Sequence, residues 1–375
     1  MSTAQLTPLD SIELRTISLP FRSPFETSLG LQNSKEALIL ILEKEGLIAY
    51  GECVAGTSPS YSEETISSAQ HIISQFLVPA LLTKEFVNPE EFLNSTRTIR
   101  GNNMAIASVE MSLWDLMGKL KQQPLSQLLG GIKSEVQVGV SIGIQPSIQR
   151  LIQKVDLHLA EGYKRIKVKI RRDFDIEPLK AIRKQFPDAP LQADANSAYT
   201  LEDTQLLKQL DSLNMILIEQ PLGPDDILDH SKLQKELATP ICLDESIRTV
   251  DDARKAIELQ ACRIVNVKAG RLRGLQRSKQ VHDLCVKHDT PVWCGGMYET
   301  GIGRAYNIAL ASLPGFTLPG DISASKYYFL RDIITEEFEL TDQGTIKVPD
   351  GPGIGIHVDQ KRLDSCTITK KKIEK

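Results

Sequence analysis

The chain has 375 residues, with 44 Lys and Arg against 48 Asp and Glu, a formal net charge of −4 and a pI near 6.0. This near balance, without a long basic run, excludes the electrostatic footprint of a nucleic-acid-binding or anionic-membrane-binding protein. At roughly 150 residues per domain, the chain has room for two or three domains, or for an α/β barrel with a smaller companion.

The placement of the cysteines and the length of the apolar runs indicate the cellular compartment of the protein. The six cysteines are scattered without a C-x-x-C pair, which argues against a disulfide framework and a structural zinc site. Residues 1–10 lack the basic start and apolar stretch of a signal peptide. The longest apolar run, residues 37–42, is far short of the ~20 residues that a membrane-spanning helix needs, so we interpret it as a buried strand. We therefore expect a cytoplasmic protein without membrane partners.

The first third of the chain mixes strand and helix patterns. Two strand-like runs, 37–43 and 47–52, are separated by the turn-forming residues 44–46, which predicts a hairpin. Between Asn103 and Lys121 the apolar residues step by three and four, and Pro124 ends the pattern, so we expect an amphipathic helix there. Gly130-Gly131 then marks a domain boundary, after which the texture of the sequence changes.

From residue 135 onward a short β-like run recurs about every 25 to 30 residues, with helix-compatible segments such as 148–161 and 201–213 between the runs. The alternation predicts parallel βα units, and eight units are what a closed (β/α)8 barrel requires. An open doubly wound sheet has the same periodicity, but it would expect a Gly-rich phosphate turn, which we do not find. The eight runs are 136–141, 165–170, 190–194, 215–219, 240–244, 263–268, 291–294 and 315–318.

Three acidic residues end successive predicted strands. Asp194, Glu219 and Asp244 are spaced 25 residues apart, one per βα unit, at the strand ends where such barrels carry their catalytic groups. Three converging carboxylates repel one another unless a cation neutralises them, and all-oxygen ligation suits Mg²⁺ or Mn²⁺. Taken singly, each acid could instead be a helix N-cap or a loop charge. The regular spacing of the set favours a metal site.

Lysines stand at two other strand ends. Lys167 and Lys169 are two residues apart on one strand, hence on the same face and about 7 Å apart. A buried amine beside another cation loses proton affinity and can act as a general base near neutral pH. Lys268 ends the sixth strand, nearly across the predicted barrel. A solvated, basic edge strand would explain the first two lysines, but not Lys268.

The combination points to a reaction class. A carboxylate substrate bound to a divalent metal can lose its α-proton to a lysine. Return of a proton from the opposite lysine gives racemisation, whereas expulsion of a β-leaving group gives dehydration, and the residues support both. None of the six histidines lies at a predicted strand end and no G-x-S-x-G elbow is present, so a histidine base or a serine nucleophile is not expected.

These motifs, taken together, resemble those of the enolase superfamily. Within it the resemblance is to the muconate-lactonising subgroup, in the o-succinylbenzoate synthase / N-succinylamino acid racemase branch, and it covers nearly the whole chain. Mandelate racemase-like members carry a histidine at strand seven, where this chain has Trp293-Cys294. Dipeptide epimerases carry an acid pair where Asp321 is followed here by Ile322. The motifs are Lys167-Val168-Lys169, Asp194-Ala195-Asn196-Ser197, Ile218-Glu219-Gln220-Pro221, Leu243-Asp244-Glu245-Ser246, Asn266-Val267-Lys268, 295–305 and 318–323.

The resemblance implies domain limits and residue roles. Residues 1–130 would form an α+β capping domain, residues 131–325 the barrel, and residues 326–375 a segment that completes the barrel and packs back on the cap. The cap loops 21–30 and 53–61 would close over the substrate. Asp194, Glu219 and Asp244 would bind Mg²⁺, with Mn²⁺ as the alternative. Lys169 would be the base, and Lys268 would be the opposing acid/base or a stabilising cation. Lys167 would hold the substrate carboxylate, and the further substrate contacts would be Ser141, Asn196, Gly296, Met297 and Ile322.

The resemblance also implies an activity. The leading hypothesis is Mg²⁺-dependent dehydration of 2-succinyl-6-hydroxy-2,4-cyclohexadiene-1-carboxylate in menaquinone biosynthesis. Racemisation of N-succinylamino acids, as sole or additional activity, is the alternative, since Arg271 resembles an arginine of racemase-competent members. A barrel that has lost catalysis and serves only for binding is the distant alternative. The expected partners are a small-molecule carboxylate and, in a homo-oligomer, further copies of the chain.

Overall fold

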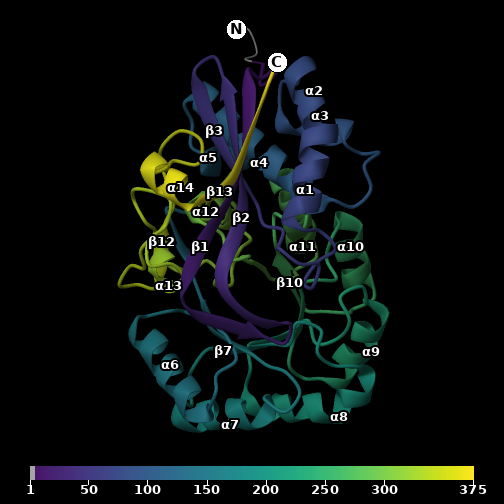
Figure 1. Cartoon of the computed structure of the whole chain (residues 1–375). Coiled ribbons are helices and arrows are strands. Elements are labelled where there is room, and N and C mark those ends of the chain that lie inside the picture. The colour runs from purple at the N-terminus through teal and green to yellow at the C-terminus, as the bar shows by residue number, and fades with distance from the viewer. Residues whose placement is uncertain (1–4) are drawn as a thin grey trace.

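An antiparallel sheet and a ring of parallel strands are stacked in the computed structural model, which describes residues 5–375 (Figure 1). The first four residues of the stretch examined for a signal peptide therefore lie outside the described residues. The antiparallel cap sheet has the strand order β13-β1-β2-β3. Its strands are β1 (Ser11–Thr27), β2 (Gly30–Lys44), β3 (Leu47–Cys53) and β13 (Thr367–Glu374).

The predicted hairpin is confirmed as β2 and β3. Lys44 pairs with Leu47, and the two residues between them, Glu45 and Gly46, have φ values of 50° and 80°. Positive φ at both positions is the requirement of the tight turn that matches the twist of a two-stranded ribbon. β1 and β2 form a second, longer ribbon, whose tip at Thr27 and Gly30 reaches down to the mouth of the barrel (Figure 1).

Helix α4 (Asn103–Lys121) has the predicted limits, but the prediction that it is amphipathic is wrong. Every residue from Met104 to Gly118 is buried. The cap sheet covers one side of the helix. The two backbones approach so closely there that a Cβ on Gly51 of β3 would lie 2.4 Å from the Ser108 carbonyl oxygen. The barrel covers the other, where Glu110 accepts hydrogen bonds from residues at the start of a barrel helix. The other cap helices are α1 (Ile66–Ile72), which continues through the π-helical turn Ile73–Leu77 into α2 (Val78–Thr83), then α3 (Pro89–Ser95) and α5 (Leu125–Leu129).

Seven parallel strands form the curled sheet of the barrel, in chain order, so the α/β barrel prediction is confirmed. The eighth run is not a strand. Phe316 and Gly320 make single parallel bridges to Val292 and Val138, and this segment closes the ring between the first and last strands. Prolines at 314 and 319 have no N–H to give to a ladder, which prevents regular pairing. The seven strands are β5 (Val140–Ile142), β6 (Ile166–Lys169), β7 (Leu191–Asp194), β8 (Leu217–Glu219), β9 (Ile241–Leu243), β10 (Ile264–Val267) and β11 (Val292–Cys294).

Helices surround this ring on its outer side (Figure 1). The segment 201–213, expected to be helical, is mostly 3-10 helix, with only Thr204–Leu207 (α8) in α-helical form. The other barrel helices are α6 (Ile148–Ala160), α7 (Ile176–Gln185), α9 (Leu228–Glu236), α10 (Val250–Glu258), α11 (Leu275–Lys287), α12 (Gly301–Ala311) and α13 (Ser325–Tyr328).

The inside of the barrel has an apolar floor and a polar upper level. Leu217, Cys242, Ile264 and Trp293 form a separate buried cluster inside the ring. Side chains alternate across a strand, so the residue two positions further along each strand faces the same interior. These residues are polar: Glu219 follows Leu217, Asp244 follows Cys242, and Asn266 follows Ile264. The strand pattern therefore places acids and amides directly above an apolar layer.

After α13 the chain returns to the cap. The short strand β12 (Thr345–Lys347) pairs with β4 (Glu135–Gln137), and α14 (Gln360–Cys366) leads into β13, which pairs along β1 from Ser11 to Ile17. One continuous apolar core runs through cap and barrel. The domain limits 1–130, 131–325 and 326–375 stay a prediction. No helix within residues 5–375 is long and apolar enough to cross a membrane.

Candidate active site

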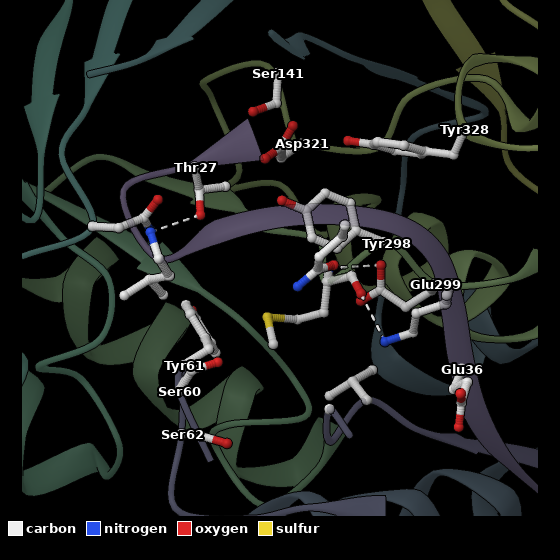
Figure 2. A pocket seen from close by; sticks show the side chains of 18 of the residues that line it. Thr27, Glu36, Ser60, Tyr61, Ser62, Ser141, Tyr298, Glu299, Asp321 and Tyr328 are labelled. Atoms are coloured by element: carbon white, nitrogen blue, oxygen red, sulfur yellow. Dashed lines mark hydrogen bonds between the residues drawn. The ribbon is translucent and has the colours of Figure 1, made fainter. Parts of the chain in front are cut away.

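A cavity of about 390 Å³ lies between the cap and the carboxyl ends of the barrel strands. The tip of the β1–β2 ribbon and the cap loop 54–62 line one side, and strand ends of the barrel line the other. Figure 2 shows Tyr61 from that loop on one side of the cavity and Ser141 and Asp321 on the other. The eight residues predicted as lysines of the reaction or substrate contacts all line it: Ser141, Lys167, Lys169, Asn196, Lys268, Gly296, Met297 and Ile322.

The three predicted metal ligands lie just beneath this cavity. Asp194, Glu219 and Asp244 are each 1% exposed or less. Asp194 and Glu219 are register partners on adjacent strands, and Asp244 directly follows the next strand, so the three carboxylates occupy neighbouring positions of the ring. The lysines lie between these acids and the cavity and contact them directly.

Lys169 is held by barrel residues alone. Its Nζ donates to Asp194 Oδ2 at 2.6 Å and to Asn196 Oδ1 at 2.7 Å. Asn196, at φ 40°, turns the chain away from the strand, and its Nδ2 donates to Glu245 Oε1 at 2.8 Å. Burial alone would raise the pKa of Asp194, but the charges of Lys169 and Lys167 lower it below its usual value.

Lys167 lies deeper and is surrounded by acids. Its Nζ is 2.6 Å from Asp321 Oδ2, 3.1 Å from Asp194 Oδ2 and 3.2 Å from Glu219 Oε2. Burial alone would lower the pKa of Lys167, yet Asp321, Glu219 and Asp194 together raise it well above its usual value. The residue that sequence reasoning missed here is Asp321. It lies within a motif quoted for the resemblance, but it follows the irregular eighth segment and so carried no strand-end signal.

Lys268 is held by the barrel and by the cap together. Its Nζ donates to Asp244 Oδ2 at 2.8 Å and to Tyr61 Oη of the cap loop at 2.9 Å. Arg271 Nη2 lies 2.6 Å from the other oxygen of Asp244. A Cβ on Gly295 would lie 2.8 Å from Lys268 Cε, so glycine at this position gives the lysine stem room to lie along the inner wall.

The expectation that a neighbouring cation lowers the proton affinity of the two lysines on β6 is wrong for Lys167. For Lys268 too, burial lowers the pKa, but Asp244, followed by Tyr61, raises it well above its usual value. Carboxylates outweigh the neighbouring cations because Lys167 and Lys268 each contact an acid within 3.2 Å. A cation shared by the same carboxylates would weaken this effect on the lysines.

The donor set can be tested for its fit to a divalent metal. With the side chains as they stand, no group of three His, Cys, Asp or Glu within residues 5–375 is arranged to hold a metal ion, and each of the three acids contacts a lysine ammonium group. Burial, followed by the charge of Asp194, raises the pKa of Glu219, although the charge of Lys167 lowers it. Three neighbouring carboxylates at one end of a barrel provide the all-oxygen chemistry that suits Mg²⁺ or Mn²⁺. The residues fit such an ion.

Lys169 and Lys268 lie on opposite sides of the ring. Between β6 and β10 there are three strands in one direction, β7, β8 and β9, and β11, the 316–320 segment and β5 in the other. Both amines line the same cavity. A carbon atom bound between them would present one face to each lysine. This arrangement can remove a proton from one face and can also deliver or remove one at the other.

The fold and this site define a class of barrel enzyme with an α+β cap, and sequence comparison assigns the chain to it. Residues 11–130 match the family model described as the mandelate racemase / muconate lactonizing enzyme N-terminal domain, and residues 150–362 match the enolase C-terminal domain-like model. The chain belongs to the mandelate racemase / muconate lactonizing enzyme family of the enolase superfamily.

Similar proteins narrow the class further. An o-succinylbenzoate synthase of Geobacillus stearothermophilus is 49% identical over 360 residues, 96% of each chain. An N-succinylamino acid racemase of Thermus thermophilus is 48% identical over 360 residues, 96% of this chain and 97% of that one. A crystal structure of an enolase superfamily member from Listeria innocua matches with a TM-score of 0.94 at 44% identity, covering 98% and 99% of the two chains. The chain is an enzyme of this superfamily, a lyase or racemase similar to these relatives.

Proposed function

We propose that the protein is an o-succinylbenzoate synthase, which dehydrates 2-succinyl-6-hydroxy-2,4-cyclohexadiene-1-carboxylate in menaquinone biosynthesis. The observation that carries the proposal is the pair of lysines on opposite sides of one cavity, each bonded to a carboxylate of the acid set. The similarity to o-succinylbenzoate synthases over nearly the whole chain supports it.

Asp194, Glu219 and Asp244 would hold Mg²⁺, or Mn²⁺, in keeping with the use of a divalent metal in the superfamily. The ion would supply Lewis-acid stabilisation of the negative charge that develops on the substrate carboxylate. Lys167, which is surrounded by the same acids and lines the cavity, would hold that carboxylate by charge, and Ser141, Gly296, Met297 and Ile322 would contact the rest of the substrate.

Lys169 is the base of the proposed reaction. A neutral amine keeps two N–H donors, and the two acceptors Asp194 Oδ2 and Asn196 Oδ1 take both. Its lone pair is then the group left to point into the cavity. Lys169 takes the proton from the carbon that bears the carboxylate, the electrons of that C–H bond form the new ring double bond, and the β-hydroxyl leaves. The proton on Lys169 Nζ passes to the departing hydroxyl, so water is released and the ring becomes aromatic, which makes the elimination strongly downhill.

Racemisation of N-succinylamino acids is the second candidate function. The observation that favours it is the separate set of partners of Lys268, which would let this lysine deliver a proton to the opposite face of the same carbon. The similarity to the Thermus thermophilus racemase supports it as well. In this reaction the handedness of the substrate decides which of Lys169 and Lys268 removes the proton and which returns one.

One experiment separates these functions. The protein is incubated with Mg²⁺ in D₂O, and dehydration of the cyclohexadiene carboxylate and α-deuteration of N-succinylamino acids are measured side by side. We expect dehydration, and deuteration as well if the racemase function is present. Full dehydration activity of Lys169→Ala, or unchanged deuteration of both enantiomers by Lys268→Ala, would contradict the two-lysine mechanism. No turnover of either substrate would favour a barrel without catalysis.

A further inference from the structure

Tyr61 links the cap to one of the two lysines. Its hydroxyl accepts hydrogen bonds from Lys268 Nζ at 2.9 Å and from Arg271 Nη1 at 3.1 Å, and donates to Asp244 Oδ2 at 3.2 Å. A tyrosine hydroxyl has one donor and two acceptor positions, so its hydrogen-bonding capacity is fully used. Within residues 5–375, no other cap atom hydrogen-bonds Lys169 or Lys268.

The partners of Tyr61 are themselves fixed by the barrel. Arg271 Nε donates to the carbonyl oxygen of Ile247 at 3.0 Å, and the guanidinium also contacts Asp244. Asp244 and Arg271 are each 6% exposed or less. The hydroxyl of Tyr61 therefore meets a rigid frame, and its position relative to Lys268 is set by three contacts rather than by one.

This frame determines where the remaining N–H of Lys268 points. A lysine stem has four flexible carbons, so the direction of its ammonium is set by the acceptors around it. Asp244 Oδ2 and Tyr61 Oη take two N–H groups, and the tetrahedral geometry of Nζ then directs the third position into the cavity. With Asp244 as the sole acceptor, the ammonium would be free to rotate about that single hydrogen bond.

We infer that Tyr61 is a positioning residue for Lys268, through which the cap loop 54–62 controls proton transfer at one face of the substrate and not at the other. Lys169 has no such link, because both of its acceptors belong to the barrel. The inference rests on the proposed function, since it needs a carbon acid bound between the two lysines. It makes the opposite-face step, which racemisation requires, depend on a cap residue.

The test compares the two enantiomers of one N-succinylamino acid. Initial rates of α-deuteration are measured separately for each with the Mg²⁺-loaded protein in D₂O, for the wild type and for Tyr61→Phe, Lys268→Ala and Tyr306→Phe. Lys268→Ala identifies the enantiomer whose proton Lys268 removes. We expect Tyr61→Phe to slow exchange of that same enantiomer by about 10- to 100-fold relative to the other, mainly in kcat, since a misplacement of about 1 Å has an effect of this size.

Tyr306→Phe is the matched control. It also removes a buried tyrosine hydroxyl, one that donates to the carbonyl oxygen of Tyr50 and lies outside the cavity. The ratio of the two exchange rates should stay as in the wild type. Because both rates come from one preparation, a loss of folded or metal-loaded protein cancels in the ratio.

The outcomes distinguish the inference from the function on which it rests. If Tyr61→Phe slowed exchange of both enantiomers equally, Tyr61 would be a structural anchor of the loop and the inference would be wrong. The inference would also be wrong if Tyr61→Phe changed neither rate. In either case, exchange by the wild type would leave the proposed chemistry in place. If the wild type neither exchanges nor dehydrates, the proposed function fails and this inference fails with it. Amide hydrogen exchange adds a readout without turnover: loop 54–62 should exchange faster in Tyr61→Phe and not in Tyr306→Phe.

Discussion

The two sides of the barrel mouth hold similar lysines by different means. On the β6–β7 side, Lys169 is bonded to Asp194 and Asn196, two residues from a single strand end. On the β9–β10 side, Lys268 is bonded to Asp244 of the barrel and to Tyr61 of the cap. In the proposed mechanism, proton transfer at one side would therefore depend on the barrel alone, whereas at the other it would also depend on the position of the cap loop. The predictions below test this difference.

Metal removal should have the largest effect and should affect both sides. If Asp194, Glu219 and Asp244 hold one Mg²⁺, a chelator should bring dehydration and α-deuteration down to the background rate, and added Mg²⁺ should restore both. The measurement is activity before chelation, after chelation and after readdition of Mg²⁺ or Mn²⁺. Activity that survives exhaustive chelation would contradict the metal site on both sides of the barrel.

Removal of one lysine should separate the sides. Lys169→Ala should lower dehydration by about 10²- to 10⁴-fold, the usual contribution of a positioned base. For deuteration, Lys169→Ala and Lys268→Ala should impair opposite enantiomers more strongly. The measurement is kcat for dehydration together with the two exchange rates. Lys180→Ala, an exposed lysine paired with Glu177, should leave all three unchanged and serves as the control.

Asn196 should be the barrel counterpart of Tyr61. Asn196→Ala removes the neutral acceptor of Lys169, and we expect a fall of roughly tenfold in exchange of the enantiomer that Lys169 serves, again by misplacement of the amine. The ratio of the two exchange rates should therefore move in the direction opposite to that of Tyr61→Phe. Thermal melting of the variant measures how much stability is lost through the strain of alanine at φ 40°. A ratio that moves in the same direction would remove the distinction between the sides.

Glu110 gives the cap a second attachment on the Lys268 side. Its carboxylate accepts hydrogen bonds from the backbone N–H groups of Leu275 and Gln276, at the start of α11, and from Trp114 Nε1. Glu110→Ala leaves these buried donors without a partner, so the free energy of unfolding should fall by about 1–3 kcal/mol. Urea unfolding measures it, with the exposed Glu177→Ala as control, expected to stay within about 0.5 kcal/mol. Equal stability of the two variants would show that this attachment contributes little.

His230, which lies between the two sides, should give the smallest effect, a dependence of the free energy of unfolding on pH. Its Nε2 accepts from the backbone N–H of Leu222, just beyond Glu219, and its burial lowers its pKa below the usual value of 6.5. The unfolded chain therefore binds a proton more readily, so this contribution to stability is complete above about pH 6.5 and is lost as the pH falls through the lower, folded-state pKa. Unfolding free energies from pH 7.5 to 5 should decrease, by at most about 1.4 kcal/mol per pKa unit of the shift. The slope should be flatter in His230→Gln but not in the exposed His288→Gln.

Spacing along the sequence was enough to predict the acids and lysines of the candidate site. Asp194, Glu219 and Asp244 recur every 25 residues because each βα unit returns to the same end of the barrel. The alternation of side chains on a strand likewise indicated that Lys167 and Lys169 share a face. Their roles as metal ligands and proton carriers stay predictions, as does assembly into a homo-oligomer.

Residues that reach the site from irregular segments could not be predicted in this way. Asp321 contacts Lys167 after a segment that prolines keep from forming a strand, and Tyr61 contacts Lys268 across 207 positions of sequence. The buried surroundings of α4 were missed for a related reason, because its polar residues Glu110 and Asp115 find partners that only the tertiary fold supplies. The rise in the pKa of Lys167 has the same origin, since its strongest acidic partner, Asp321, was not expected there.

The return of the chain to the cap through β13 limits how the cavity can open. The cap sheet is built from segments near both ends of the described chain, so two crossings rather than one join it to the barrel. A body attached by one linker can swing about it as a hinge, but a second attachment and a shared apolar core remove that freedom. We therefore expect the substrate to enter by movement of the ribbon tip at Thr27–Gly30 and of loop 54–62, which line the cavity, and not by rotation of the whole cap.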